Sequence, residues 1–71
     1  MDVKTTELIA IGAAVTANCP TCVDHHMGKS REAGVDEANI REAVRVGRMV
    51  RKGSASTLDK KATSFPSEDD R

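Results

Sequence analysis

Aromatic side chains are almost missing from this sequence of 71 residues, in which Phe65 is the only one. A folded core must therefore be built from aliphatic side chains, and a chain of this length buries only about 60% of the surface that it exposes when unfolded. Cysteine is also scarce, and the pair Cys19 and Cys22 is too close in sequence to tie distant segments together. The sequence therefore predicts one small domain that gains further stability by forming a homo-oligomer.

An excess of charge of either sign is missing as well. The 11 basic and 11 acidic residues balance to a formal net charge of zero, so no overall positive field attracts polyanions, and we expect no nucleic-acid partner. The apolar run from Leu8 to Ala17 is shorter than the roughly 20 residues that a membrane span needs, so we expect no membrane partner. Asp2 and Glu7 place negative charge where a signal peptide has positive charge, which indicates a cytoplasmic protein. In that compartment, a lone close cysteine pair indicates redox or metal chemistry.

Helical spacing of apolar residues accounts for the chain up to Gly53, and no strand pattern competes with it. The first helix is predicted from Asp2 to Thr16, where apolar residues cover nearly the whole circumference, as in a buried helix. A second helix is predicted to begin at Pro20, which suits a first helical position, and to end at Gly34. The third has Asp36 as its N-cap and Gly53 as its stop. The expected fold class is all-α: a small domain of about three helices that assembles into a helical homo-oligomer.

The third predicted helix has two different faces, and a polar tail follows it. Its expected core-facing stripe repeats at helical spacing and consists of Ile40, Ala43, Val44, Gly47 and Val50. A basic face, which we interpret as solvated, carries Arg41, Arg45, Arg48 and Lys52. The following segment is rich in Ser, Thr, Lys and Asp, and its apolar residues Leu58 and Phe65 show no periodicity. We therefore expect a helical domain over residues 1–53 and a flexible polar tail over residues 54–71.

The cysteine pair falls at the expected start of the second helix. Backbone N–H groups and the helix dipole stabilise a thiolate at such a position, and they can lower the pKa of a cysteine to roughly 3.5–7.5. Because Cys19 and Cys22 are three residues apart, they share one helix face and can form a strained, reducible disulfide. His26 follows Cys22 by four residues, so its imidazole can take the thiol proton or stabilise the thiolate. The pattern predicts a reactive thiol, with Cys22 better activated than Cys19.

Other interpretations of these residues stay open from the sequence alone. The cysteines could pack as two small hydrophobic residues, or they could join one of the histidines as zinc ligands, although a structural zinc site normally has four ligands. His25 is interpreted as a solvated surface histidine outside the site. Glu7, judged by periodicity alone, is an exposed carboxylate on a helix surface.

Glu7, Cys19, Cys22 and His26 together form the pattern E-x11-C-x2-C-x3-H. This arrangement resembles the alkylhydroperoxidase D-like branch of the carboxymuconolactone decarboxylase superfamily, over about residues 4 to 53. The similarity includes the apolar segment ELIAIGAAVTANC and the later segment AGVDEANIREAVRVG. It implies an all-helical fold that forms trimers or hexamers, in which neighbouring subunits complete the site.

The resemblance also implies roles for these residues. Cys22 would be the attacking thiol, and Cys19 would be its proton donor and resolving partner. Glu7 and His26 would form a proton relay to the thiols. Thr21 stands where some enzymes of the branch have a histidine, so the implied relay lacks that member. The decarboxylase branch does not use such a cysteine pair, and lactone decarboxylation is therefore not expected.

The predicted function is that of a thiol-dependent antioxidant enzyme, a CxxC peroxidase or thiol-disulfide oxidoreductase that reduces hydroperoxides or partner disulfides. We expect it to need no bound cofactor and no metal, and to take electrons from a lipoyl group, a thioredoxin-like protein or a small thiol. The alternative is a non-enzymatic metal- or ligand-binding helical module that uses the cysteine and histidine cluster. A third interpretation is a helical oligomerisation module with an idle motif.

Overall fold

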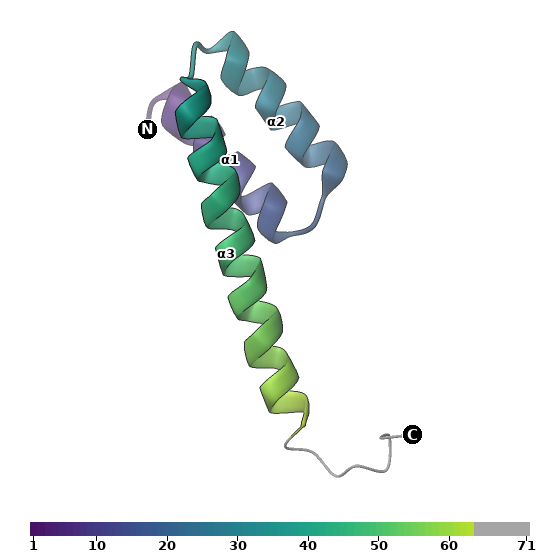
Figure 1. Cartoon of the computed structure of the whole chain (residues 1–71). Coiled ribbons are helices and arrows are strands. Elements are labelled where there is room, and N and C mark those ends of the chain that lie inside the picture. Colours follow the sequence, from purple (N-terminus) through teal and green to yellow (C-terminus); the bar gives the residue numbers. More distant parts are fainter. Residues whose placement is uncertain (64–71) are drawn as a thin grey trace.

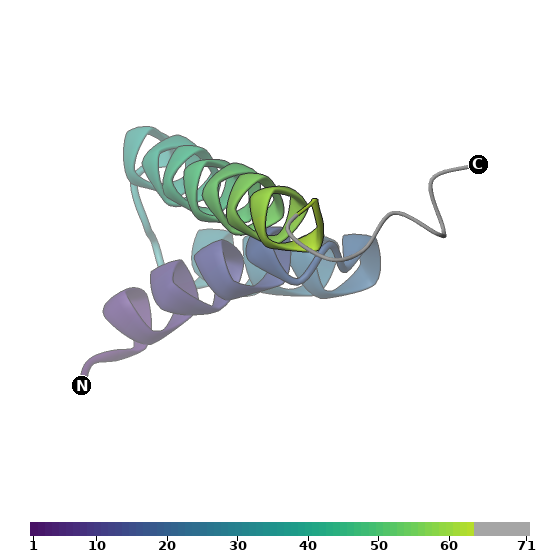
Figure 2. The same ribbon diagram turned by 90° about the horizontal axis from the view of Figure 1, so that it is seen from below.

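Three α-helices make up the protein, whose computed structural model describes residues 1–63. The helices are α1 (Val3–Thr16), α2 (Pro20–Glu32) and α3 (Glu37–Ala62), and no strand occurs among the described residues (Figure 1). α1 and α2 form an antiparallel hairpin, and Figure 2 shows α3 on one side of the molecule with this hairpin on the other. α1 is the central helix because it packs against both of the others, whereas α2 and α3 make little contact. The predicted all-α fold with three helices is confirmed.

Local sequence sets the two ends of α1 as predicted. The Asp2 carboxylate caps its start by accepting a hydrogen bond from the Thr5 N–H at 2.7 Å. Beyond its end, Asn18 adopts a left-handed conformation with a φ of 58°, and the Cys19 N–H donates to the carbonyl oxygen of Ala14 at 3.0 Å. This is the Schellman arrangement, which satisfies the last carbonyl groups of a helix. It turns the chain so that Cys19 begins the next helix.

The ends of α2 also follow from its sequence. Cys19 is the N-cap and Pro20 is the first helical residue, where the missing N–H of proline has no cost. After the last turn, Gly34 takes a φ of 78°, and the Val35 N–H donates to the carbonyl oxygen of Ser30 at 2.9 Å. The helix therefore ends with a second Schellman arrangement, and the prediction that Gly34 terminates it is confirmed.

The start of α3 follows from the sequence, but its end does not. The Asp36 carboxylate caps the first turn, as predicted. The prediction that the helix stops at Gly53 is wrong, because α3 continues to Ala62. Glycine inside a helix costs only about 1 kcal/mol relative to alanine, and the alanine, leucine and lysine residues that follow favour helix. Residues 54–62, predicted to be a flexible tail, are therefore helical, while residues 64–71 of that tail, with Phe65, lie outside the described residues.

A small aliphatic core holds the three helices together. It is centred on Ile11, Val35 and Ile40, which are 0%, 8% and 3% exposed. Partly buried side chains surround these three residues, namely Leu8, Met27, Ala33, Ala43 and Val44. Val50, predicted to face the core, is instead 48% exposed, because it borders the uncovered side of the α1–α3 contact that is described below.

Gly47 allows α1 and α3 to approach closely. A Cβ atom added at Gly47 would lie 2.7 Å from the carbonyl oxygen of Gly12 and 2.8 Å from the Cβ atom of Val15. Neither distance is tolerated between non-bonded atoms, so no larger residue fits without moving a helix. The hydroxyl of Thr16 bridges the same contact, since it donates to the Gly12 carbonyl oxygen at 2.8 Å and lies 3.2 Å from that of Gly47.

One side of the α1–α3 contact is left uncovered in the single chain. The α1–α3 groove, as we call it, has a volume of about 520 Å³ and is lined mainly by apolar side chains, among them Ile9, Ala13, Val46 and Val50. Ile9 is 55% exposed, so α1 is not buried all round in one chain as its apolar circumference predicted. No helix within residues 1–63 is long and apolar enough to cross a membrane.

Candidate active site

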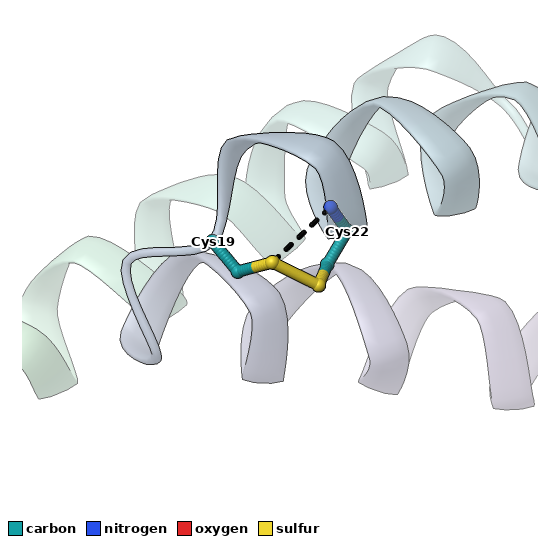
Figure 3. The surroundings of a disulfide bond; sticks show 2 residues. All are labelled: Cys19 and Cys22. Atoms are coloured by element: carbon teal, nitrogen blue, oxygen red, sulfur yellow. Dashed lines mark hydrogen bonds between the residues drawn. A yellow bond between two sulfur atoms is a disulfide. The ribbon is translucent and has the colours of Figure 1, made fainter.

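The two cysteines are joined in a disulfide at the N-terminus of α2. Their Cα atoms are 5.3 Å apart and their sulfur atoms 2.11 Å apart (Figure 3). The Cys22 N–H, one of the unpaired donors of the first helical turn, points at the Cys19 sulfur at 3.3 Å. Cys22 is an exposed residue and Cys19 is half-buried, so the two cysteines differ in exposure.

Two residues that the sequence analysis missed hold this end of α2 in place. Asn18 makes the left-handed turn that delivers Cys19 to the cap position. Arg51 reaches back from α3, and its Nη1 atom donates to the carbonyl oxygen of Val15 at 3.2 Å and to Oδ1 of Asn18 at 3.4 Å. A signal for Asn18 existed, since asparagine is the non-glycine residue that best tolerates this conformation. The contact made by Arg51 joins residues more than 30 positions apart and has no local signal.

Glu7 and His26 meet across the α1–α2 hairpin. Oε2 of Glu7 lies 2.8 Å from Nδ1 of His26, and the two residues are 19 positions apart in sequence. Glu7 is only 8% exposed, so it is not the exposed carboxylate that periodicity alone suggested. An ionised carboxylate can only accept a hydrogen bond, so when Glu7 is ionised the proton of this bond lies on Nδ1 and Nε2 of the same ring is left to exchange one.

His26 also lies one helical turn along α2 from Cys22, on the same face. The structure therefore places His26, which is bound to the buried Glu7 carboxylate, on the same face of α2 as Cys22. Both sulfur atoms are in the disulfide and carry no proton, and no hydrogen bond joins His26 to either of them within the described part of the chain.

The neighbouring polar residues do not join this cluster. His25 is exposed and contacts the His26 ring edge to face, with 4.9 Å between the ring centroids. Thr21, which stands between the two cysteines, is also exposed. Across residues 1–63, no three His, Cys, Asp or Glu side chains are grouped closely enough to hold a metal ion.

Comparison with known proteins accounts for this arrangement of helices and cysteines. The sequence profile of the carboxymuconolactone decarboxylase family matches residues 1–60. The chain belongs to this family. Within it, the chain is 37% identical over 60 residues to "Alkyl hydroperoxide reductase AhpD" of Azorhizobium caulinodans, which covers 84% of this chain and 33% of that protein. This similarity supports the alkylhydroperoxidase D-like branch, as the pattern of glutamate, cysteines and histidine predicted.

A second family relative is matched over nearly the whole chain. It is "Uncharacterized protein 4 in cox locus" of Paracoccus denitrificans, which is 33% identical over 70 residues, or 99% of this chain and 63% of that protein. The chain thus spans less than two thirds of the length of either relative. No solved structure is significantly similar to it.

Proposed function

We propose that the protein is a thiol-dependent oxidoreductase that reduces hydroperoxides or partner disulfides. The observation that carries the proposal is the hydrogen bond between Glu7 and His26, because it supplies a half-buried histidine, oriented by a buried carboxylate, one turn from a cysteine pair at a helix N-terminus. Family membership and the similarity to an alkyl hydroperoxide reductase give independent support. The name of that relative favours a hydroperoxide as the substrate.

The proposed oxidation starts from the exposed thiol of Cys22. Its thiolate attacks one oxygen of the hydroperoxide, the O–O bond breaks, and the alcohol leaves after it takes a proton. Cys22 is then a sulfenic acid. The Cys19 thiolate attacks the Cys22 sulfur, water leaves, and the disulfide that the structure contains is formed. With a partner disulfide in place of the peroxide, the same two attacks release the partner as a dithiol.

Protons for these steps would pass through His26. Its free ring nitrogen accepts the thiol proton and later returns it to the leaving alcohol or water, while Glu7 stabilises the imidazolium that forms in between. Because Glu7 is buried, its charge is less screened by water than that of a surface carboxylate. The reaction as proposed needs no bound cofactor or metal. Its electrons come from a thiol donor of the lipoyl, thioredoxin-like or small-molecule class, in the cytoplasm.

We also propose that the working form is a homo-oligomer, a trimer or hexamer. The α1–α3 groove leaves an apolar face of α1 in contact with water, with Ile9 and Val46 at 55% and 38% exposure. A second copy of the chain would cover this face and offset the small size of the core.

Thiolate titration of the reduced protein tests the assignment of the nucleophile. In Cys19→Ser, which keeps Cys22, we expect an apparent thiol pKa within the lowered range of roughly 3.5–7.5 that helix N-termini produce. In Cys22→Ser, the remaining thiol of Cys19 should titrate at higher pH. Two thiols that both titrate near the free-cysteine value of about 8.5 would instead support an idle motif.

Histidine substitutions then test the relay, with His25→Ala as a matched control for His26→Ala. The two histidines are adjacent, but only His26 is bound to a buried carboxylate. His26→Ala should raise the apparent pKa of the Cys22 thiol and slow its attack at neutral pH, whereas His25→Ala should change neither. If both variants titrate like the wild type, the helix N-terminus alone activates the thiol.

Glu7→Gln separates the proton relay from the positioning of the histidine. The substitution keeps the shape and removes the charge, so we expect turnover with peroxide or disulfide to fall by about a hundredfold or more without a change in oligomer size. Unchanged turnover in Glu7→Gln and His26→Ala would contradict the relay. One equivalent of zinc retained after purification without added metal would favour the alternative, a metal-binding module.

A further inference from the structure

A second hollow lies beside the disulfide, between the end of α1, the start of α2 and Arg51 of α3. It has a volume of about 250 Å³, and its lining includes Cys19, Pro20, Asp24 and Arg51. Cys22 does not line it. Cys19, the less exposed of the two cysteines, therefore has its own recess, which is large enough for a small molecule only.

Arg51, which lines this hollow, has unused hydrogen-bonding capacity. Its Nη1 atom is occupied by Val15 and Asn18, but within residues 1–63 its Nε and Nη2 atoms donate to no acceptor. No ion pair joins Arg51 to Asp24 within that range either, although both line the hollow. The free edge of a guanidinium is the group that binds a carboxylate through two parallel hydrogen bonds.

We propose that this hollow is the binding site of the electron donor, a small thiol that carries a carboxylate, and that Arg51 is the specificity-determining residue that binds the carboxylate. The inference rests on the proposed function. Of the three donor classes named there, it selects the small-molecule thiols. Arg51 would hold the donor so that its sulfur attacks Cys19, the only sulfur atom that lines the hollow.

Attack at Cys19 also gives the better leaving group. The donor thiolate forms a bond to the Cys19 sulfur, the disulfide breaks, and the electron pair leaves on the Cys22 sulfur, which then takes a proton. A second donor thiolate attacks the donor sulfur of the mixed disulfide and releases the Cys19 thiolate. Two donor thiols are thereby oxidised to one disulfide, and the protein disulfide is reduced to two thiols. Exchange is faster when the thiol that leaves is the more acidic one, and Cys22 has His26 one turn away.

Asp24 provides a second charged residue in the hollow, of opposite sign to Arg51, whose substitution should have the opposite effect. It lines the same hollow as Arg51 but repels a carboxylate, so the two residues should act in opposite directions on a negatively charged donor. Arg48 offers a matched control on the same helix, because it is an exposed arginine three residues away that does not line the hollow.

The test compares reduction of the Cys19–Cys22 disulfide by 3-mercaptopropionate and by 2-mercaptoethanol, at an ionic strength of about 0.15 M to screen distant charges. For each variant, the rate with 3-mercaptopropionate is divided by the rate with 2-mercaptoethanol. Dividing this ratio by the wild-type ratio cancels the different reactivities of the two thiols. We expect Arg51→Gln to lower this ratio about tenfold, as the loss of a charge-assisted hydrogen bond would. Arg48→Gln should change it less than twofold, and Asp24→Asn should raise it.

A purely structural role for Arg51, through its bond to Asn18, predicts a different result. Loosening the turn would change the rates with both thiols by the same factor and leave their ratio unaltered. An unaltered ratio in Arg51→Gln, or an equal fall in Arg48→Gln, would overturn the proposal. Arg51→Lys keeps the charge without the paired donors, and it should show an intermediate ratio.

A second arm does not depend on disulfide turnover. In Cys22→Ser, the single thiol of Cys19 is modified with a methanethiosulfonate that carries an ethylsulfonate and with the neutral methyl reagent. Adding Arg51→Gln should again lower the ratio of the anionic to the neutral rate, with Arg48→Gln as the control. A protein that shows this change but does not turn over peroxide or disulfide would contradict the proposed function and keep the anion site. A protein that turns over peroxide or disulfide but lacks this change in the rate ratio would support the proposed function and contradict the anion site.

Discussion

The two halves of α3 have the same secondary structure for different reasons. In residues 37–47, Ile40 and Gly47 are buried against α1, and the contact at Gly47 is so close that no side chain fits. In residues 48–62, every residue is exposed, and the helix extends beyond the other two (Figure 1). The first half is fixed by tertiary packing, whereas in one chain the second half depends on helix propensity and on the hydrogen bonds of Arg51.

The difference matters for the site because the packed half supports the helix that carries Glu7. α1 is held between α2 and the first half of α3, so the carboxylate of Glu7 has a fixed position relative to His26. Arg51 is the exception in the exposed half, since it reaches back to the end of α1. Substitutions on the two sides of Gly47 should therefore have unequal effects on stability and on the site.

The largest effect is expected from Gly47→Ala, with Gly53→Ala as its control on the same helix. The new methyl group at position 47 would collide with Gly12 and Val15, and such overpacking costs about 1–3 kcal/mol. At position 53 the methyl group meets open space, and the better helix propensity of alanine should stabilise the chain by about 0.5–1 kcal/mol. Chemical denaturation of both variants measures these two opposite changes.

The comparison would fail if the two glycine variants behaved alike. A stable Gly47→Ala protein with unaltered Glu7 and His26 chemistry would mean that α1 and α3 are not in close contact in solution. A destabilised Gly53→Ala protein would mean that the exposed half packs against something, for which a second copy of the chain is the first candidate.

A smaller effect is expected on assembly. Val46→Lys places a charge in the α1–α3 groove, and we expect it to weaken association at least tenfold, which is about 1.4 kcal/mol, in sedimentation experiments. Val3→Lys is the control, because Val3 is 66% exposed but does not line the groove. A wild-type protein that is a stable, folded monomer at micromolar concentration would contradict the homo-oligomer itself.

Removal of residues 54–71 should have a weaker effect still. The segment from 54 to 62 is fully exposed in the single chain, so we expect its loss to change the free energy of unfolding by less than about 1 kcal/mol. Thiol reactivity and oligomer size should be retained, because Arg51 and the groove remain. A large loss of thermal stability would show that Leu58 or Phe65 docks on a neighbouring subunit.

The smallest effect is expected from pH, at the exposed start of α1. The hydrogen bond from the Thr5 N–H lowers the pKa of Asp2 from its ordinary value of 3.8. Because the pKa is lower in the folded state, the cap stabilises α1 above the ordinary pKa, and this contribution is lost as the pH falls through the folded pKa. Thermal unfolding followed by circular dichroism should show a higher melting temperature for the wild type than for Asp2→Asn at neutral pH, and this difference should shrink below about pH 4. A difference in melting temperature that stays constant down to pH 2 would show that the charge of Asp2 does not stabilise the helix.

The sequence by itself determined the features that depend on neighbours within one or two turns. Helix starts are set by the side-chain caps of Asp2 and Asp36 and by Pro20, which lacks the N–H that a first helical residue does not need. The end of α2 is set by Gly34, whose backbone adopts the left-handed conformation. The same short range places the two cysteines together at the start of α2, with His26 one turn away. Gly53 gave a wrong end for α3, because glycine weakens a helix without stopping it.

Only the tertiary structure decided which distant residues meet. Three contacts join parts of the chain that are far apart in sequence: the hydrogen bond between Glu7 and His26, the contact of Arg51 with Asn18 and the close approach at Gly47. Such contacts depend on how the helices cross and how closely they approach, and these are properties of the packed core as a whole. Periodicity placed Glu7 on the surface of α1, and the packing of α2 over that surface buried it beside a histidine.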